Sequence, residues 1–379
     1  MPSMTACSHA AVFMRGGTSK ALVFHARDLP AERADWPALF LSVMGSPDPN
    51  GRQLDGMGGG VTSLSKVCVV GPPTRDDADV DYSFFQVLPR EACVLTQGNC
   101  GNMSAAIGPF AVDEGLVPAS GAEATVRIHN TNTRKLIRAR FALADGRAAV
   151  DGALAIPGVA GTGAPVRLDF LDPEGAATGR LLPTGHATDR LEVEGLGRVE
   201  VSIVDAANLC VFVEASAVGL AGTELPDALE ADGELLHRLK ALGAAAVLHC
   251  GLAPDAAAAR RRLPLIAVVS APQPAPTLSG EQIAAQACDL CIRMLSSGQP
   301  HRALPATGTV CTAVALAIEG SVAWRVGRPA GTGPRRLAMP SGVIAVEADV
   351  AGHGAQAQAR SGTLYRTARR LFEGRVFAR

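Results

Sequence analysis

Apolar runs broken by short polar stretches recur along the chain, and three pairs of segments repeat in the same order. AVFMRGGTSKALVFHARDL, from Ala11, resembles EVSIVDAANLCVFVEASAV, from Glu200, and both segments have the pattern of two apolar strands joined by a polar break. SKVCVVGPP resembles PLIAVVSAP, and NCGNMSAAIGPFAVDEGL, from Asn99, resembles ATGTVCTAVALAIEGSVA, from Ala306. The repeat predicts a duplicated architecture in which each half wraps antiparallel strands around one central helix.

The remaining pattern predicts connections and boundaries. Helical periodicity favours helices over Ala31–Met44, Asp232–Leu242 and Glu281–Leu295. A Pro- and Gly-rich zone from Gly152 to Gly197 is the expected crossover between the halves. We therefore predict an α+β fold with lobes over 1–190 and 191–379, and a C-terminal strand that is a candidate to return to the first lobe. A cleft between two such lobes is a natural ligand site.

Composition narrows the class of protein. The 379 residues suffice for two cores, and a hydrophobic content of 47% indicates a folded chain. With 35 basic and 36 acidic residues there is no electrostatic case for nucleic acid, and no apolar run is long enough for a membrane span. The N-terminus lacks a signal-peptide pattern, and nine cysteines, an odd number, are typical of reduced thiols. We predict a cytoplasmic location.

Cys100 stands out among the cysteines because QGNCGN places it at the start of the first central helix. Unpaired N–H groups at a helix N-terminus stabilise an anion, so a thiolate there would be populated and a substrate carboxylate could be held beside it. The alternative is an inert buried thiol. Other cysteines lie inside apolar runs, and CDLC at Cys288–Cys291 falls in an expected helix without the further ligands that zinc needs.

Lys66 is the second candidate. It follows a glycine-rich stretch, LDGMGGG, whose glycines would let backbone approach a ligand closely, and it opens an otherwise uncharged strand, SKVCVV. Partial desolvation favours the neutral amine, which is a general base. The alternative is a lysine at a strand edge that reaches water. The repeat places apolar Ile266 at roughly the equivalent position, so only one half carries a charge there.

Two polar segments are candidates for holding an anion. RGGTSK offers consecutive N–H groups with the hydroxyls of Thr18 and Ser19, although an ordinary polar turn explains it equally well. PHRALPATGT supplies His301, which could bind a carboxylate, act on protons or be structural. It also places Thr307 where Cys100 stands in the first half, followed by Gly308 and Thr309.

These motifs together resemble the methylaconitate isomerase (PrpF) and 4-oxalomesaconate tautomerase family. The resemblance rests on MRGGTSK, GSPDPNGRQLDGMGGGVTSLSKV, QGNCGN, LLPTGH, GTELP, MPSG and YRTARRLFEG, which span nearly the whole chain. It implies a diaminopimelate epimerase-like fold with two pseudo-symmetric lobes, each a curled, mostly antiparallel sheet around a central helix. It also implies an isomerase that needs no cofactor or metal.

The resemblance implies an isomerase that acts by proton transfer on a small unsaturated di- or tricarboxylate, through either a 1,3-allylic proton shift or a cis-trans isomerisation. Lys66 and Cys100 match the family's two proton-handling positions; we expect Lys66 to abstract the proton and Cys100 to return it, or the reverse. The expected substrate-binding residues lie at both helix starts and in the polar turns: Thr18, Ser19, Ser65, Gly101, Asn102, Met103, His301, Thr307, Gly308 and Thr309. Because the second half has a threonine where the related epimerases have a second cysteine, a 1,3-proton shift is favoured over two-thiol racemisation.

The substrate is left open at this stage. The segment QACDLCIRMLSSGQPHRALPATGT favours methylaconitate or aconitate, with 4-oxalomesaconate as the alternative. An accessory protein that binds a polycarboxylate without converting it is an alternative of another class. Beyond the small polycarboxylate we expect no nucleic-acid or membrane partner, and a homodimer or other homo-oligomer is a candidate assembly.

Overall fold

The chain divides into two compact units. The computed structural model describes residues 7–96, 100–262, 264–296, 298–329, 331 and 333–379. Unit 1 comprises Met1–Leu168 and Arg366–Arg379, and unit 2 comprises Asp169–Tyr365. The sequence placed the division at residue 190, whereas the contacts place it after Leu168 and return the chain to unit 1 at Arg366.

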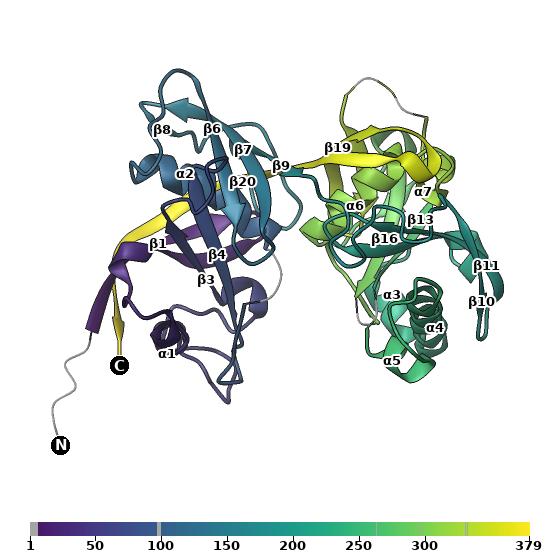
Figure 1. Ribbon diagram of the computed structural model, residues 1–379, viewed down its shortest axis with the longest axis horizontal. Coiled ribbons are helices and arrows are strands. Elements are labelled where there is room, and N and C mark those ends of the chain that lie inside the picture. The colour runs from purple at the N-terminus through teal and green to yellow at the C-terminus, as the bar shows by residue number, and fades with distance from the viewer. Residues whose placement is uncertain (1–6, 97–99, 263, 297, 330, 332) are drawn as a thin grey trace. The chain divides into compact units, whose positions relative to one another are not determined.

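Unit 1 wraps strands around a central helix. Helix α2 (Gly101–Asp113) contacts strands β1, β2, β3, β6, β7 and β8, so that nearly every one of its residues is buried (Figure 1). A second helix, α1 (Trp36–Met44), packs its aromatic residues against the sheet, with the rings of Phe40 and Phe85 4.9 Å apart. The strands are β1 (Cys7–Gly16), β2 (Ser19–His25), β3 (Lys66–Gly71), β4 (Val80–Val87), β5 (Val94–Leu95), β6 (Glu123–Asn130), β7 (Lys135–Ala144) and β8 (Arg147–Ala148).

Unit 2 has the same plan around α6 (Ala306–Ala317). Its helices are α3 (Pro226–Ala231), α4 (Gly233–His249), α5 (Ala256–Arg260) and α7 (Val322–Val326). Its strands are β10 (Asp189–Val193), β11 (Gly197–Asp205), β12 (Leu209–Glu214), β13 (Leu265–Ser270), β14 (Ala275–Pro276), β15 (Gln282–Ile283), β16 (Leu290–Ser296), β17 (Gln299–Pro300), β18 (Arg335–Met339) and β19 (Gly342–Ala351). Strands β9 (Pro165–Leu171) and β20 (Gln358–Ala378) carry the chain between the units.

The strand pairings confirm the internal repeat. In unit 1, β1–β2 is antiparallel, β2–β3 parallel, β3–β4 antiparallel, β4–β6 parallel and β6–β7 antiparallel. Unit 2 repeats this order with β11, β12, β13, β16, β18 and β19. Lys66 pairs with Gln86, which also pairs with the short strand β5. Ile266 pairs with Leu295, which in the same way also pairs with the short strand β17. Ile266 is therefore the structural equivalent of Lys66, as the sequence indicated.

The central helices are aligned two residues away from the sequence-based match. Cys100 is the N-cap of α2, and Pro305 is the N-cap of α6. Both helices begin with the same backbone hydrogen bond, to the Cys100 carbonyl in one and the Pro305 carbonyl in the other. Pro305, and not Thr307, is therefore the structural equivalent of Cys100. The conclusion that unit 2 has no second thiol at this point is unchanged.

Two of the three predicted connecting helices are present. Trp36–Met44 and Gly233–His249 are helical, but the helix predicted over Glu281–Leu295 is wrong. That segment contains β15, a short 3-10 turn and β16, in which Leu290–Leu295 is wholly buried. A strand that is covered on both faces loses the alternation of polar and apolar residues, so periodicity alone does not separate it from a helix.

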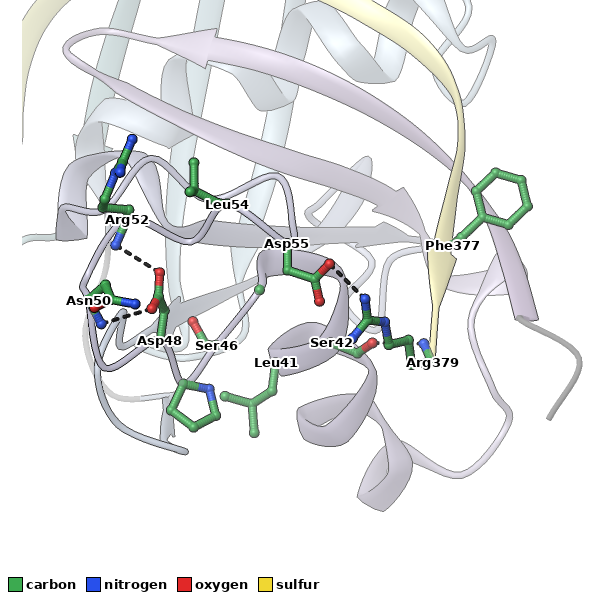
Figure 2. Close-up of a pocket in the computed structure, with 12 residues that line it drawn as sticks. Leu41, Ser42, Ser46, Asp48, Asn50, Arg52, Leu54, Asp55, Phe377 and Arg379 are labelled. Atoms are coloured by element: carbon green, nitrogen blue, oxygen red, sulfur yellow. Dashed lines mark hydrogen bonds and ion pairs between the residues drawn. The ribbon is translucent and has the colours of Figure 1, made fainter. Parts of the chain in front are cut away.

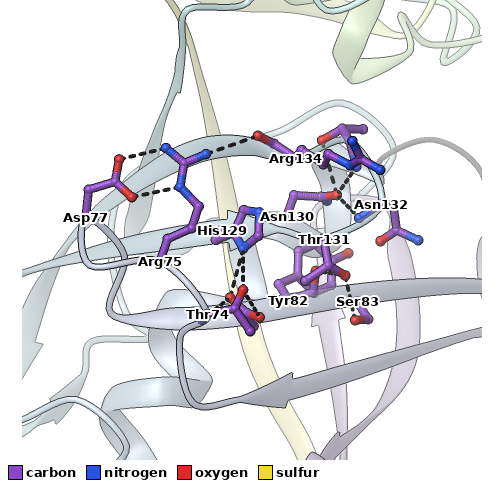
Figure 3. A network of polar contacts seen from close by, with 12 residues as sticks. Thr74, Arg75, Asp77, Tyr82, Ser83, His129, Asn130, Thr131, Asn132 and Arg134 are labelled. Atoms are coloured by element: carbon purple, nitrogen blue, oxygen red, sulfur yellow. Dashed lines mark hydrogen bonds and ion pairs between the residues drawn. The ribbon is translucent and has the colours of Figure 1, made fainter. Parts of the chain in front are cut away.

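Polar side chains fasten β4 to β6 (Figure 3). The Nδ1 atom of His129 lies 2.9 Å from the carboxylate of Asp81, and the Thr131 and Ser83 hydroxyls are 2.7 Å apart. Asn130 accepts backbone N–H bonds at its own turn, which closes the β6–β7 hairpin.

Among the described residues, no helix is long and apolar enough to cross a membrane.

An ionic cluster lies at the C-terminal end of α2, where the helix dipole disfavours a negative charge and favours a positive one. The C-cap residue Glu114 lies 3.0 Å from His25 Nε2 and accepts from Arg370 at 2.7 Å. Burial alone would raise the pKa of Glu114, but the hydrogen bonds from His25 and Arg370 outweigh it and lower that pKa. A carboxylate with a lowered folded-state pKa stabilises the protein above its unfolded-state pKa of about 4.3, and this contribution is lost as the pH falls through the folded-state value.

We therefore expect Glu114→Gln to flatten the acid limb of the stability curve. Urea midpoints measured between about pH 5 and about pH 3 should fall less steeply in Glu114→Gln than in the unsubstituted protein. Glu123→Gln, at an exposed position on β6, is the matched control and should follow the parent curve. Parallel curves for all three proteins would contradict the assignment.

Candidate active site

Lys66 is the first residue of β3 and is buried, with 7% of its surface exposed. Its Nζ atom lies 5.0 Å from the centre of the Phe84 ring and donates to Oε1 of Gln86. In the part of the chain that the structure describes, no carboxylate pairs with this amine. An amine held in place by Gln86 at the start of a strand is a candidate to exchange a proton with a bound acid.

Gln86 is fixed by its other contacts. Its Nε2 atom donates to the carbonyl oxygens of Thr62 at 2.9 Å and Ser65 at 2.8 Å, so its Oε1 atom must face Lys66. Sequence reasoning missed Gln86, because nothing in a strand pattern shows which cross-strand neighbour will face the lysine.

The glycine-rich loop before Lys66 packs on itself. A Cβ atom on Gly56 would lie 2.2 Å from the Gly45 nitrogen, and one on Gly58 would lie 2.2 Å from the Gln53 side chain. Gln53 is itself buried and donates at 2.7 Å to the hydroxyl of Ser65. The close approaches that the structure records are thus to the protein. Ser65 is fully buried and anchors this loop to β3.

On the outer side of the same loop lies a cavity of about 460 Å³ between α1 and the C-terminus (Figure 2). The carboxylate of Asp48 accepts from backbone N–H groups, including that of Asn50 at 2.9 Å, and Asp55 pairs with Arg379 at 2.7 Å. Neither Lys66 nor Cys100 lines this cavity. Its polar groups are engaged in holding the loop.

Cys100 is half-buried at the N-cap of α2, with extended backbone angles. Its carbonyl accepts from the Ser104 N–H at 2.9 Å, while its side chain makes no capping bond. The thiol therefore stands at the positive end of the helix dipole. The three residues before Cys100 in QGNCGN, 97–99, lie outside the described residues.

Buried Cys68 is affected by the charges of both Lys66 and Cys100 within unit 1. Burial raises the pKa of the Cys68 thiol, the Cys100 charge raises it further, and the Lys66 charge opposes the rise. The Tyr82 hydroxyl lies 3.8 Å from the Cys68 sulfur, and burial followed by the charges of Cys68 and Cys100 raises the pKa of Tyr82. Both candidate proton carriers thus act on the same buried thiol.

A second cluster joins the turn between β1 and β2 to the start of α2. Asn102 donates through Nδ2 to the Thr18 hydroxyl at 3.0 Å, and its Oδ1 atom accepts from Arg366 Nε at 3.0 Å. Unit 2 repeats this link with Asn208 in the turn and Thr307 on the helix, 3.4 Å apart. Sequence reasoning identified Thr18 and Asn102, but it missed Arg366, which comes from the distant C-terminal strand.

Gly17 makes this cluster possible, because its φ is +52° and a Cβ atom there would lie 2.3 Å from Asn102 Oδ1. We expect Gly17→Ala to lower the free energy of unfolding by about 2 to 4 kcal/mol, from backbone strain and steric overlap together. Gly115→Ala is the matched control, since Gly115 has a φ of +70° with nothing within 4 Å of its Cβ position. Chemical denaturation should show the smaller loss, of about 1 kcal/mol, for the control; equal losses would contradict the packing argument.

The other predicted residues of unit 1 are buried at the same place. Ser19 pairs with Gly16 at the start of β2, and Gly101 and Met103 lie in the first turn of α2. Asn132, which was not predicted, bonds both backbone groups of Phe84 and donates at 2.7 Å to the carbonyl of Thr96, in the segment that leads to Cys100.

The four predicted residues of unit 2 have different surroundings. Gly308 and Thr309 are buried in α6; a Cβ atom on Gly308 would lie 2.3 Å from the Met294 sulfur, and the Thr309 hydroxyl donates to the Pro305 carbonyl at 3.0 Å. Among the described residues, the buried Nε2 atom of His301 has no hydrogen-bond partner, and burial lowers the pKa of His301. His301 thus retains a polar atom for a ligand, whereas Thr309 is engaged in the helix.

Cys288 and Cys291 are both buried, with their sulfur atoms 4.0 Å apart. Burial and then Cys291 raise the pKa of Cys288 to about 11. The Cys288 thiol is protonated at neutral pH and is therefore a poor nucleophile.

Comparison with known proteins identifies the family. A family model described as PrpF protein matches residues 7–379. The chain belongs to the PrpF family. A solved methylitaconate-delta-isomerase has a TM-score of 0.90 and 40% identity, covering 98% of this chain and 96% of that one. A hydroxyproline epimerase from Agrobacterium vitis, at 13% identity and a TM-score of 0.50 over 98% and 92% of the chains, shares the fold alone. The fold is thus diaminopimelate epimerase-like, as the resemblance implied.

Three relatives cover nearly the whole chain. The 3-methylitaconate isomerase of Eubacterium barkeri is 41% identical over 97% of this chain and 96% of its own. The 4-oxalomesaconate tautomerase of Pseudomonas putida is 39% identical (96% and 94%), and the 2-methyl-aconitate isomerase of Cupriavidus necator is 38% identical (97% and 96%). This member of the family is an enzyme, and it is an isomerase.

Proposed function

We propose that this chain catalyses a 1,3-proton shift in a small unsaturated di- or tricarboxylate, with methylaconitate, methylitaconate or aconitate as the first candidates. The observation that carries the proposal concerns Lys66 and Cys100. Lys66 is a buried amine without a carboxylate partner among the described residues, Cys100 is a thiol at a helix N-terminus, and the charges of both act on the same buried thiol, Cys68. The names of the relatives support the substrate class.

The proposed reaction needs two proton transfers. The neutral Lys66 amine takes a proton from one end of the allylic system, leaving a dienolate whose charge is shared with a substrate carboxylate. The Cys100 thiol then gives its proton to the other end, and the double bond moves between them. Lys66 is left as an ammonium and Cys100 as a thiolate, and exchange with solvent restores both groups.

The substrate carboxylates are proposed to bind the N–H groups of Gly101–Met103 and the hydroxyls of Thr18 and Ser19. The corresponding role of His301 and Thr307 stays a prediction. We propose no cofactor, because the two side chains suffice for the chemistry.

4-Oxalomesaconate is the second candidate substrate. A named tautomerase of this acid is about as similar to the chain as the methylaconitate isomerase, so overall identity does not separate the two. Both reactions move a proton along a conjugated acid, and the same pair of residues serves either.

Proton NMR in D2O tests the proposal. Purified protein is incubated with methylaconitate, cis- and trans-aconitate, methylitaconate and 4-oxalomesaconate in turn. Deuterium that enters one acid as its double bond moves establishes the reaction and names the substrate. Acids that bind without any exchange would favour a binding protein and contradict the enzyme.

A further inference from the structure

Arg366 is a buried cation at the start of α2 that the proposed chemistry does not yet use. It has 5% of its surface exposed, and it belongs to β20, which pairs with β1 from Ala368 onward. Its Nε atom donates to Asn102 Oδ1 at 3.0 Å, and its Cδ atom would lie 3.2 Å from a Cβ on Gly17. The guanidinium is therefore packed against the turn and the helix end that carry the expected carboxylate ligands.

The contact decides which way the Asn102 amide points. A guanidinium has donors only, so the amide must turn its oxygen to Arg366 and its NH2 group to Thr18. The Thr18 hydroxyl accepts that bond and keeps its own hydrogen for another acceptor. A substrate carboxylate is such an acceptor, whereas a flipped Asn102 would consume the hydrogen.

The charge of Arg366 also acts on Cys100. Desolvation lowers the pKa of Arg366 to about 10, while the Cys100 charge acts in the opposite direction. The guanidinium therefore remains charged at neutral pH, and the two groups are close enough to interact. Because Arg366 bonds Asn102, two residues from Cys100, its positive charge would stabilise the negative charge that Cys100 carries after it has donated its proton.

We propose that Arg366 is a positioning residue for the proton shift: it orients Asn102 so that Thr18 donates to the substrate, and it places a fixed positive charge beside the Cys100 thiolate. The proposal deepens the proposed function and rests on it.

Three variants separate the two roles. Arg366→Met removes both the hydrogen bond and the charge, Arg366→Lys keeps the charge, and Thr18→Val removes only the hydroxyl. Arg375→Met is the matched control, because Arg375 is an exposed arginine on the same strand that bonds Ser8. The readouts are kcat and KM by NMR and the rate at which iodoacetamide alkylates Cys100 at neutral pH, followed by peptide mass spectrometry.

We expect Arg366→Met to lower kcat about 100-fold and to slow Cys100 alkylation about tenfold. Arg366→Lys should alkylate at a rate within about threefold of the parent's, but its KM should be about tenfold above the parent's. Thr18→Val should raise KM by a similar factor and leave the alkylation rate unchanged. Arg375→Met should match the parent.

Alkylation and kinetic constants that are unchanged in folded Arg366→Met would overturn the proposal. If that variant does not fold, Arg366→Lys and Thr18→Val decide: a KM equal to the parent's in both would overturn it as well. Failure of the proposed function is distinguishable, since it appears as a parent protein inactive on every acid, while the alkylation rates still test the charge of Arg366.

Discussion

We expect Lys66→Met to abolish movement of the double bond, with a loss of at least about 1,000-fold in kcat. Methionine fills a similar volume and keeps the apolar contact with Phe84, but it has no lone pair on nitrogen to accept the proton. The loss should therefore be in the chemistry while the protein stays folded. Lys240→Met, on the exposed face of α4, is the matched control and should keep the parent rate.

Deuterium exchange also shows which group acts first. If Lys66 abstracts the first proton, Lys66→Met should show no exchange into the starting acid. Exchange at the parent rate in a folded Lys66→Met protein would mean that another base does this work.

Cys100→Ser should lower the rate of isomerisation by about 100- to 1,000-fold, the second largest effect. Serine conserves shape and the N-cap position of α2, but its hydroxyl gives up a proton far less readily than a thiol. If Cys100 returns the proton, this variant should still place deuterium at the carbon from which Lys66 removes the proton, without moving the double bond. The reversed assignment predicts the opposite pattern for the two variants.

Cys7→Ser is the control for the thiol, because Cys7 is exposed at the start of β1. It should not change either rate. Full isomerisation by Cys100→Ser would remove Cys100 from the mechanism and leave Lys66 as a single base that serves both carbons.

Burial makes three of the other thiols unsuitable as replacements for Cys100. It raises the pKa of Cys68 and Cys210 well above the usual value, and that of Cys250 to about 11. These cysteines remain protonated and unreactive at neutral pH. Alkylation of Cys100 can therefore be measured without interference from them.

The sequence by itself determined the repeat, the two central helices and the candidate pair. Apolar strand patterns and the small residues at NCGN and ATGT are local signals. The predictions made from them agree with the structure, in which the strands are paired in the same order in both units. The equivalence of Lys66 and Ile266 followed from the same pattern.

Only the tertiary structure decided what surrounds that pair. The segment Leu290–Leu295 is a strand because it pairs with β13 and β18, both of which lie far from it in the sequence. Arg366 lies 264 residues from Asn102, and the spacing of Gln86 from Lys66 has meaning only once β3 and β4 pair. Hydrogen bonds between distant segments set the orientation of the Asn102 amide and the surroundings of the Lys66 amine, and the local sequence does not reveal them.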